Sequence, residues 1–67
     1  MGIQPEDIYI IIPAYNEAQT ITGVIRQLTD RNYPNIAVVD DGSTDQTAAE
    51  ARQAGALVIA HYINRGA

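Results

Sequence analysis

The sequence predicts an α/β fold in which three parallel strands alternate with two helices. Apolar runs rich in β-branched residues occur at 8–12, 36–39 and 57–60, and continuous runs of this kind are typical of strands in a parallel sheet. A helical pattern separates the first run from the second, and another separates the second from the third. Right-handed crossovers then give the strand order 3-2-1 with both helices on one face.

The first element is the strand at 8–12, "IYIII", which we expect Pro13 to end. Residues 1–7 are polar, contain Pro5, and are predicted to form a flexible tail. Residues 8–67 are predicted to form an incomplete domain, because the first strand has no helix for one of its faces and no partner for its outer edge.

The first helix is predicted from an amphipathic stripe at positions i, i+3, i+4 and i+7, formed by Ile21, Val24, Ile25 and Leu28. Asn16 is the expected N-cap, and Gln19 stands where a capping box needs it. The turn residues of "RNYPN", 31–35, end the helix.

The second half repeats this alternation. A strand at 36–39 leads through "DDGSTD" into a helix at 45–54, for which Ser43 and Gln46 form a second capping-box signal. Gly55 is the expected C′ residue, and the third strand follows at 57–60.

The composition excludes several classes of function. The 67 residues carry a net charge of −4, with eight acidic and four basic side chains, so the chain lacks the basic face that nucleic-acid binding requires. It has no cysteine for a disulfide or thiolate metal site, and no lysine for a phosphate-binding P-loop. No apolar run is long enough to span a membrane, and the N-terminus does not resemble a signal peptide, so we expect a cytoplasmic protein.

Unusual polar residues follow the first two strands. Ligands of open α/β sheets bind at the carboxyl ends of the strands, where this sequence has "PAYNE", 13–17, and "DDGS", 40–43. Tyr15 can stack on a flat ring, and a carboxylate can accept hydrogen bonds from ring N–H groups. The pair therefore suits a nucleobase, although a tyrosine such as Tyr15 is, taken alone, more often a packing residue than a ligand contact. Taken alone, "DGSTD" is equally consistent with an ordinary turn and helix cap.

The combination of "IIIPAYNE", "VVDDGSTDQT" and "NRGA" resembles the N-terminal part of family 2 glycosyltransferases, which include dolichyl-phosphate mannose synthase-like enzymes. The resemblance covers residues 8–67. It implies a partial, three-layer, Rossmann-like domain of the GT-A type. It also implies transfer of a sugar from a UDP-, GDP- or dTDP-sugar to an acceptor such as a polyprenyl phosphate or polysaccharide.

The resemblance also implies roles for single residues. Those facing the nucleotide would be Pro13, Tyr15, Glu17, Val39 and Asp41. Asp40, through backbone amides, and Gly42, through a tight turn, would shape the loop. Asn64, Arg65 and Gly66 would lie on the phosphate side.

The metal-binding Asp-x-Asp motif and the catalytic base of such enzymes lie further along the chain. We therefore expect no catalytic residue and no metal ligand here, Mg²⁺ or Mn²⁺ only in the full-length enzyme, and no activity from this chain alone.

Two other functions compete with this interpretation. A non-catalytic nucleotide-binding or assembly module fits the same residues. A phospho-receiver domain is less favoured, because its acidic pair follows the first strand and its third strand ends in a carboxylate, whereas "LVIAHYINRG" has none. For partners we expect a nucleotide-sugar, and self-association through the exposed edge of the first strand.

Overall fold

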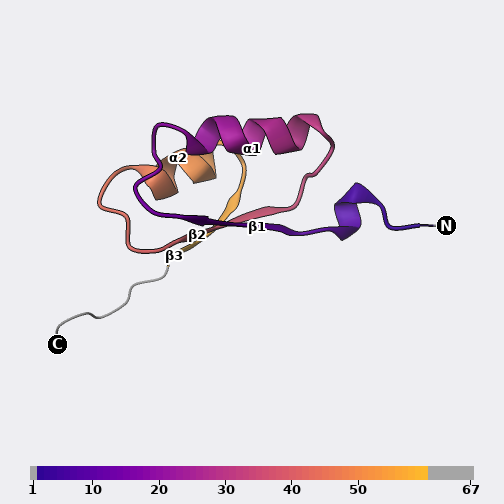
Figure 1. Cartoon of the computed structure of the whole chain (residues 1–67), viewed down its shortest axis with the longest axis horizontal. Helices are drawn as coiled ribbons and strands as arrows, with labels where there is room; N and C mark the ends of the chain where they lie inside the picture. The colour runs from indigo at the N-terminus through magenta and orange to yellow at the C-terminus, as the bar shows by residue number, and fades with distance from the viewer. Residues whose placement is uncertain (1, 61–67) are drawn as a thin grey trace.

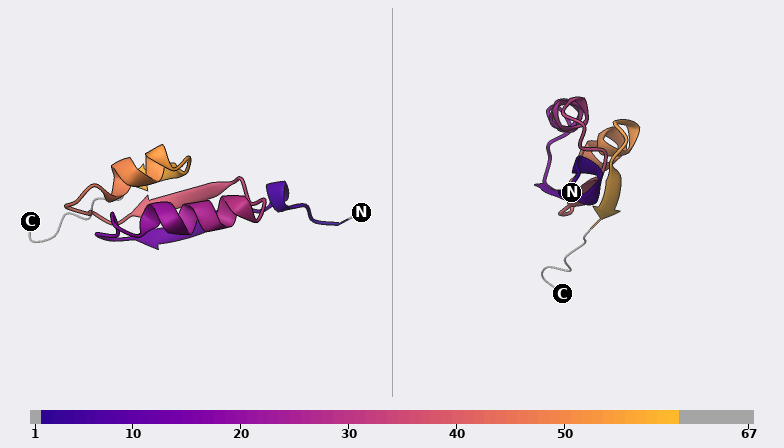
Figure 2. Two further views of the ribbon diagram at one scale, coloured as in Figure 1. Left: turned by 90° about the horizontal axis from the view of Figure 1, so that it is seen from above. Right: turned by 90° about the vertical axis from the view of Figure 1, so that its right-hand side faces the viewer.

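The computed structural model describes residues 2–60 and confirms the α/β class. Its elements are a 3-10 turn η1 (Pro5–Asp7), β1 (Ile10–Ala14), α1 (Ile21–Asp30), β2 (Ile36–Asp40), α2 (Thr47–Gln53) and β3 (Leu57–Ala60). The strands form one parallel sheet in the order β1-β2-β3, as predicted. Both helices lie over the same face of the sheet (Figure 1; Figure 2, right).

The register of the sheet brings the carboxyl ends of the strands together. Ala14 of β1 pairs with Asp40 of β2, and Asp40 pairs with Ala60 of β3. The chain segments that leave β1 and β2 therefore start side by side, at the edge where α/β sheets bind their ligands.

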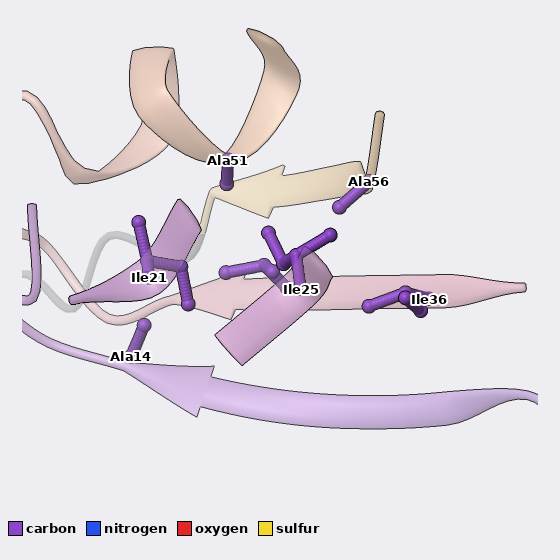
Figure 3. Packing of buried hydrophobic residues seen from close by; sticks show 7 residues of the cluster. Ala14, Ile21, Ile25, Ile36, Ala51 and Ala56 are labelled. Carbon is purple, nitrogen blue, oxygen red and sulfur yellow. The ribbon is translucent and has the colours of Figure 1, made fainter. Parts of the chain in front are cut away.

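The hydrophobic core lies between the sheet and the two helices (Figure 3). Ile25 of α1 and Val38 of β2 are fully buried at its centre. Ala51 of α2 is also fully buried, and its small side chain lets this helix pack close to the sheet. The remaining buried members are Ala14, Ile21, Ile36 and Ala56.

Both helices begin later than predicted, and neither begins with the predicted cap. Asn16 has a left-handed φ of 51° instead of the extended backbone of an N-cap, and α1 starts at Ile21. The N-cap of α2 is Gln46, which makes no side-chain capping bond. Asn16 and Ser43 are engaged elsewhere, as described below. Gly55, with a φ of 99°, ends the second helical segment as expected.

The first strand contains Pro13 instead of ending before it. The Ile10 amide donates to the Asn35 carbonyl at 2.9 Å, and the Ala14 carbonyl accepts from the Asp41 amide at 2.9 Å. By the alternation of a strand, Pro13 turns its backbone nitrogen to the outer edge, where proline is tolerated because no ladder bond is lost.

The segment before β1 contains the turn η1, whose Glu6 carbonyl accepts from Asn35 Nδ2 at 2.6 Å. Residues 2–7, expected to form a flexible tail, thus include a short helical turn that is joined to the loop before β2.

The sheet face opposite the helices is apolar and, within residues 2–60, uncovered. Its two cross-strand rows are Ile11, Ala37 and Leu57, and Pro13, Val39 and Ile59. Ile11, Leu57 and Ile59 expose 58%, 61% and 48% of their surfaces. No helix in this part of the chain is long and apolar enough to cross a membrane.

The burial of side chains along α1 predicts that substitutions at two neighbouring positions of its apolar stripe differ sharply in their effect on stability. Ile25 is fully buried whereas Val24, which the stripe also placed in the core, is 40% exposed. Ile25→Ala should lower the free energy of unfolding by about 2–5 kcal/mol, and Val24→Ala by less than about 1 kcal/mol. Urea denaturation followed by circular dichroism measures both, and equal losses would contradict this packing.

Candidate functional site

Two loops form the carboxyl edge of the sheet. The first loop, residues 15–20, connects β1 to α1, and the second loop, residues 41–46, connects β2 to α2. The amide of Asp41 donates to the carbonyl of Ala14 at 2.9 Å. The β1–β2 ladder thus continues into the second loop, and both loops leave the sheet in fixed register.

Asn16 binds the second loop with both its backbone and its side chain. Its amide donates to Ser43 Oγ at 2.8 Å. Its Oδ1 accepts from the Thr44 amide at 2.9 Å and from the Thr44 hydroxyl at 3.4 Å. The left-handed backbone at Asn16, which asparagine tolerates better than most residues, accompanies these contacts.

Asp45 and Thr47 bind the next two amides of the first loop. The Glu17 amide donates to Thr47 Oγ1 at 2.8 Å, and the Ala18 amide donates to Asp45 Oδ2 at 3.3 Å. Asp45 Oδ1 accepts from the Thr47 amide at 2.9 Å and also from the Thr47 hydroxyl. Because the single hydroxyl hydrogen of Thr47 points to Asp45, its lone pairs face Glu17.

The adjacent carboxylates of Asp40 and Asp41 have different environments. Asp40 is buried, and its Oδ1 accepts from the Ser43 amide at 3.1 Å. Asp41 is exposed. Gly42 has a φ of 74°, a backbone conformation that glycine adopts without steric cost and that reverses the chain between the carboxylates and Ser43.

The residues predicted to face the nucleotide lie around the loops. Tyr15 is 56% exposed, and Asp41 follows the residue paired with Ala14. Pro13 and Val39 are cross-strand partners on the uncovered sheet face just before the loops.

Glu17 is exposed, but its Oε2 accepts from the Thr20 hydroxyl at 3.3 Å. Its side chain is thus held against the end of its own loop. Asn64, Arg65 and Gly66 lie outside the described residues, so their expected position near the phosphates stays a prediction.

The way in which the two loops are joined is not evident from the sequence. Residue spacing predicts helix caps at Asn16 and Ser43, and no separate role for Asp45 and Thr47. The sequence signal that could have indicated this contact is the alternation of short polar side chains at 43, 45 and 47. These side chains lie beside the end of β1, where residues 15–20 belong to neither a strand nor a helix. Within residues 2–60, no three His, Cys, Asp or Glu side chains gather into a possible metal site.

Hydrogen bonds also change the acidity of Asp45. The Thr47 hydroxyl is the main cause that holds the pKa of this carboxyl below its ordinary value, with smaller contributions from the amides of Thr47 and Ala18. The ionised carboxylate is therefore the form that joins the loops.

Comparison with known proteins gives consistent results. Residues 9–67 match the family described as Glycosyl transferase family 2. The chain is 41% identical over 64 residues to an uncharacterized protein of Methanocaldococcus jannaschii. The alignment covers 96% of this chain and 26% of that protein. It is 46% identical over 55 residues to Glycosyltransferase AglJ of Haloferax volcanii, with 82% and 18% covered.

A third relative is UDP-N-acetylglucosamine--dolichyl-phosphate N-acetylglucosaminyltransferase of Methanococcus voltae. It is 58% identical over 40 residues, covering 60% of this chain and 16% of that enzyme. The alignments thus span 26% or less of the length of these relatives.

The lowered pKa of Asp45 predicts a contribution to acid sensitivity. Above the ordinary aspartate pKa of about 3.9, the stabilisation by the ionised carboxylate is fully present. It is lost as the pH falls through the lower pKa of the folded state. The stability difference between wild type and Asp45→Asn should therefore shrink between about pH 5 and pH 2.

Urea midpoints across this range, together with an NMR titration of the Asp45 carboxyl carbon, measure the effect. A titration midpoint at or above about 3.9 would contradict the hydrogen bonding described for this side chain.

Proposed function

The chain belongs to glycosyl transferase family 2, and we propose that its two loops bind the nucleotide of a sugar donor for an enzyme that transfers the sugar to an acceptor. The observation that carries this proposal is the placement of exposed Tyr15 and Asp41 at the adjoining carboxyl ends of β1 and β2. An aromatic ring and a carboxylate at this edge offer a stacking surface and a hydrogen-bond acceptor to a base.

A carboxylate at this edge suits a base that donates a hydrogen bond. An ionised carboxylate accepts hydrogen bonds and donates none. Uracil, thymine and guanine each offer a ring N–H, and we propose that Asp41 accepts this hydrogen from a UDP-, dTDP- or GDP-sugar, the donors that the family resemblance implies. Pro13 and Val39 would supply apolar contact at the foot of the loops.

The proposal divides the acidic pair into two tasks. Asp40 already accepts from the Ser43 amide and is buried, so it supports the loop from beneath. Asp41 reaches solvent at the same edge and would read the base. This division explains why two like charges stand next to each other in the sequence without sharing one environment.

Residues 2–60 contain no group of three His, Cys, Asp or Glu side chains that could hold a metal ion. We propose that Mg²⁺ or Mn²⁺, if the enzyme uses either, is held by residues outside 2–60, and that Asn64, Arg65 and Gly66 approach the phosphates. A polyprenyl phosphate is the proposed acceptor class, supported by the name of the Methanococcus voltae relative. The cytoplasmic location stays a prediction.

Nucleotide binding tests the role of Asp41. In the protein expressed from its complete coding sequence, Asp41→Ala should weaken binding of UDP, GDP or dTDP by roughly 1.5–3 kcal/mol, the value of a hydrogen bond to a charged group. Asp40→Asn should weaken it less, because asparagine keeps an oxygen for the Ser43 amide. Isothermal titration calorimetry measures the nucleotide affinity of wild type, Asp41→Ala and Asp40→Asn.

Asp30→Ala is the matched control, since Asp30 is an exposed aspartate at the far end of α1. It should bind like wild type. Equal nucleotide affinity of wild type and Asp41→Ala would refute the assignment of Asp41 to the base.

We further propose that the 67-residue chain self-associates through the outer edge of β1. The backbone groups of Ile11 point away from β2, and no described strand pairs with them. Pro13 removes one donor from this edge but leaves its carbonyl available. Antiparallel pairing of β1 with β1 of a second copy about a two-fold axis would satisfy these groups and extend the apolar sheet face.

Light scattering tests this association. The wild-type chain should be dimeric at high micromolar concentration, and Ile11→Lys should be monomeric, because a charge on an edge strand opposes pairing. Val24→Lys adds the same charge at an exposed position of α1 and should leave the dimer intact. A folded, monomeric wild-type chain at this concentration would contradict the proposal.

A further inference from the structure

We infer that Ser43, Asp45 and Thr47 are positioning residues. Together they determine where Tyr15 lies relative to Asp41. This inference rests on the proposed function, because its consequence is nucleotide affinity. The observation behind it is that three consecutive amides of the first loop donate to three alternate side chains at 43, 45 and 47. We call these three contacts the loop clamp.

The loop clamp provides hydrogen-bond acceptors for backbone amides that lie outside regular secondary structure. The amides of Asn16, Glu17 and Ala18 lie between the end of β1 and the start of α1 at Ile21. Neither the sheet nor the helix therefore supplies acceptors for them. Side chains from the other loop do so instead, at 2.8 to 3.3 Å. The contact of the Glu17 amide with Thr47 is partly buried, and an unpaired backbone amide is costly where water is excluded, so contact with the second loop stabilises the first loop.

Thr47 is the buried centre of the loop clamp. It is fully buried at the first position of α2. Its hydroxyl both accepts from the Glu17 amide and donates to Asp45, whose other oxygen accepts from the Ala18 amide. One hydroxyl thus connects the first loop to the start of a helix that packs on the core.

The sheet and the clamp together restrain the backbone beside the base-binding residues. Tyr15 lies between Ala14, which is paired in the sheet, and Asn16, which the clamp binds. Asp41 lies between buried Asp40 and Gly42, and its amide bonds to Ala14. The backbone that carries the ring and the carboxylate is therefore held by the sheet and by the loop clamp.

Burial separates this role from direct contact. Because Thr47 has no exposed surface, it cannot touch a nucleotide in this conformation. A loss of affinity on removing its hydroxyl must therefore act through the first loop. By contrast, if "DGSTD" is only an ordinary turn and helix cap, removing the Thr47 hydroxyl should lower stability without a specific change in the first loop.

Three variants of the protein expressed from its complete coding sequence test the inference. Thr47→Val keeps the shape of the side chain and removes the hydroxyl, whereas Thr47→Ser keeps the hydroxyl. Thr22→Val is the matched control, because the Thr22 hydroxyl donates to Glu50 at 3.4 Å and so joins the two helices rather than the two loops. Hydrogen exchange of residues 15–20 and calorimetric affinities for UDP, GDP and dTDP are the readouts.

Thr47→Val should speed hydrogen exchange at the amides of residues 16–18 and weaken nucleotide binding by about tenfold, which corresponds to ~1.4 kcal/mol. Thr47→Ser should restore both, and Thr22→Val should match wild type in both. Should Thr47→Val fail to fold, Ser43→Ala takes its place, because it removes only the acceptor of the Asn16 amide.

Unchanged exchange at residues 16–18 in Thr47→Val would overturn the clamp, whether or not a nucleotide binds. Faster exchange with unchanged affinity would overturn the positioning role. Failure of the wild-type protein to bind UDP, GDP and dTDP would instead refute the proposed function and the positioning role with it. In that case the exchange data would still decide whether the clamp exists.

Discussion

The geometry of the candidate site depends on three backbone amides that regular secondary structure cannot satisfy. They belong to Asn16, Glu17 and Ala18, in the gap between the end of β1 and the start of α1. A parallel strand followed by a helix on one face must turn through such a gap, and its polar groups need partners. Here the partners come from the neighbouring β-α connection. Each connection thus stabilises the other.

This mutual dependence links the site to the core. The register of β1 on β2 brings Ala14 beside Asp40, and a shift by one residue would move all three acceptors away from their amides. The same register places Ile12 and Val38 on the face that packs against Ile25. Packing therefore selects the register, and the register selects the hydrogen bonds between the loops. A substitution in the core can disturb the site without any residue of the loops being changed.

Much of the fold could be predicted from the sequence, because periodicity is a local signal. The third strand has the predicted bounds 57–60, and the buried members of the α1 stripe are Ile21 and Ile25. The wrong predictions concern residue types that can occupy more than one kind of structural position. Serine and asparagine favour helix caps, but they also satisfy amides across loops. Sequence spacing cannot show that Ser43 has a partner 27 residues away. Similarly, the missing amide hydrogen of Pro13 seemed to end β1, but at an outer edge this loss costs the sheet nothing.

The residues of the candidate site could be predicted from the sequence, but the environment of each side chain could not. Adjacent strand ends carrying Tyr15 and the acidic pair followed from the strand order alone. The different environments of Asp40 and Asp41 did not, because they depend on which way each side chain turns as β2 ends. Since side chains alternate along a strand, Asp40 continues the core-facing row of Ile36 and Val38, and burial under the loop gives it a structural task. Asp41, the first residue of the second loop, is exposed. The two neighbouring carboxylates thus have different environments because β2 ends between them.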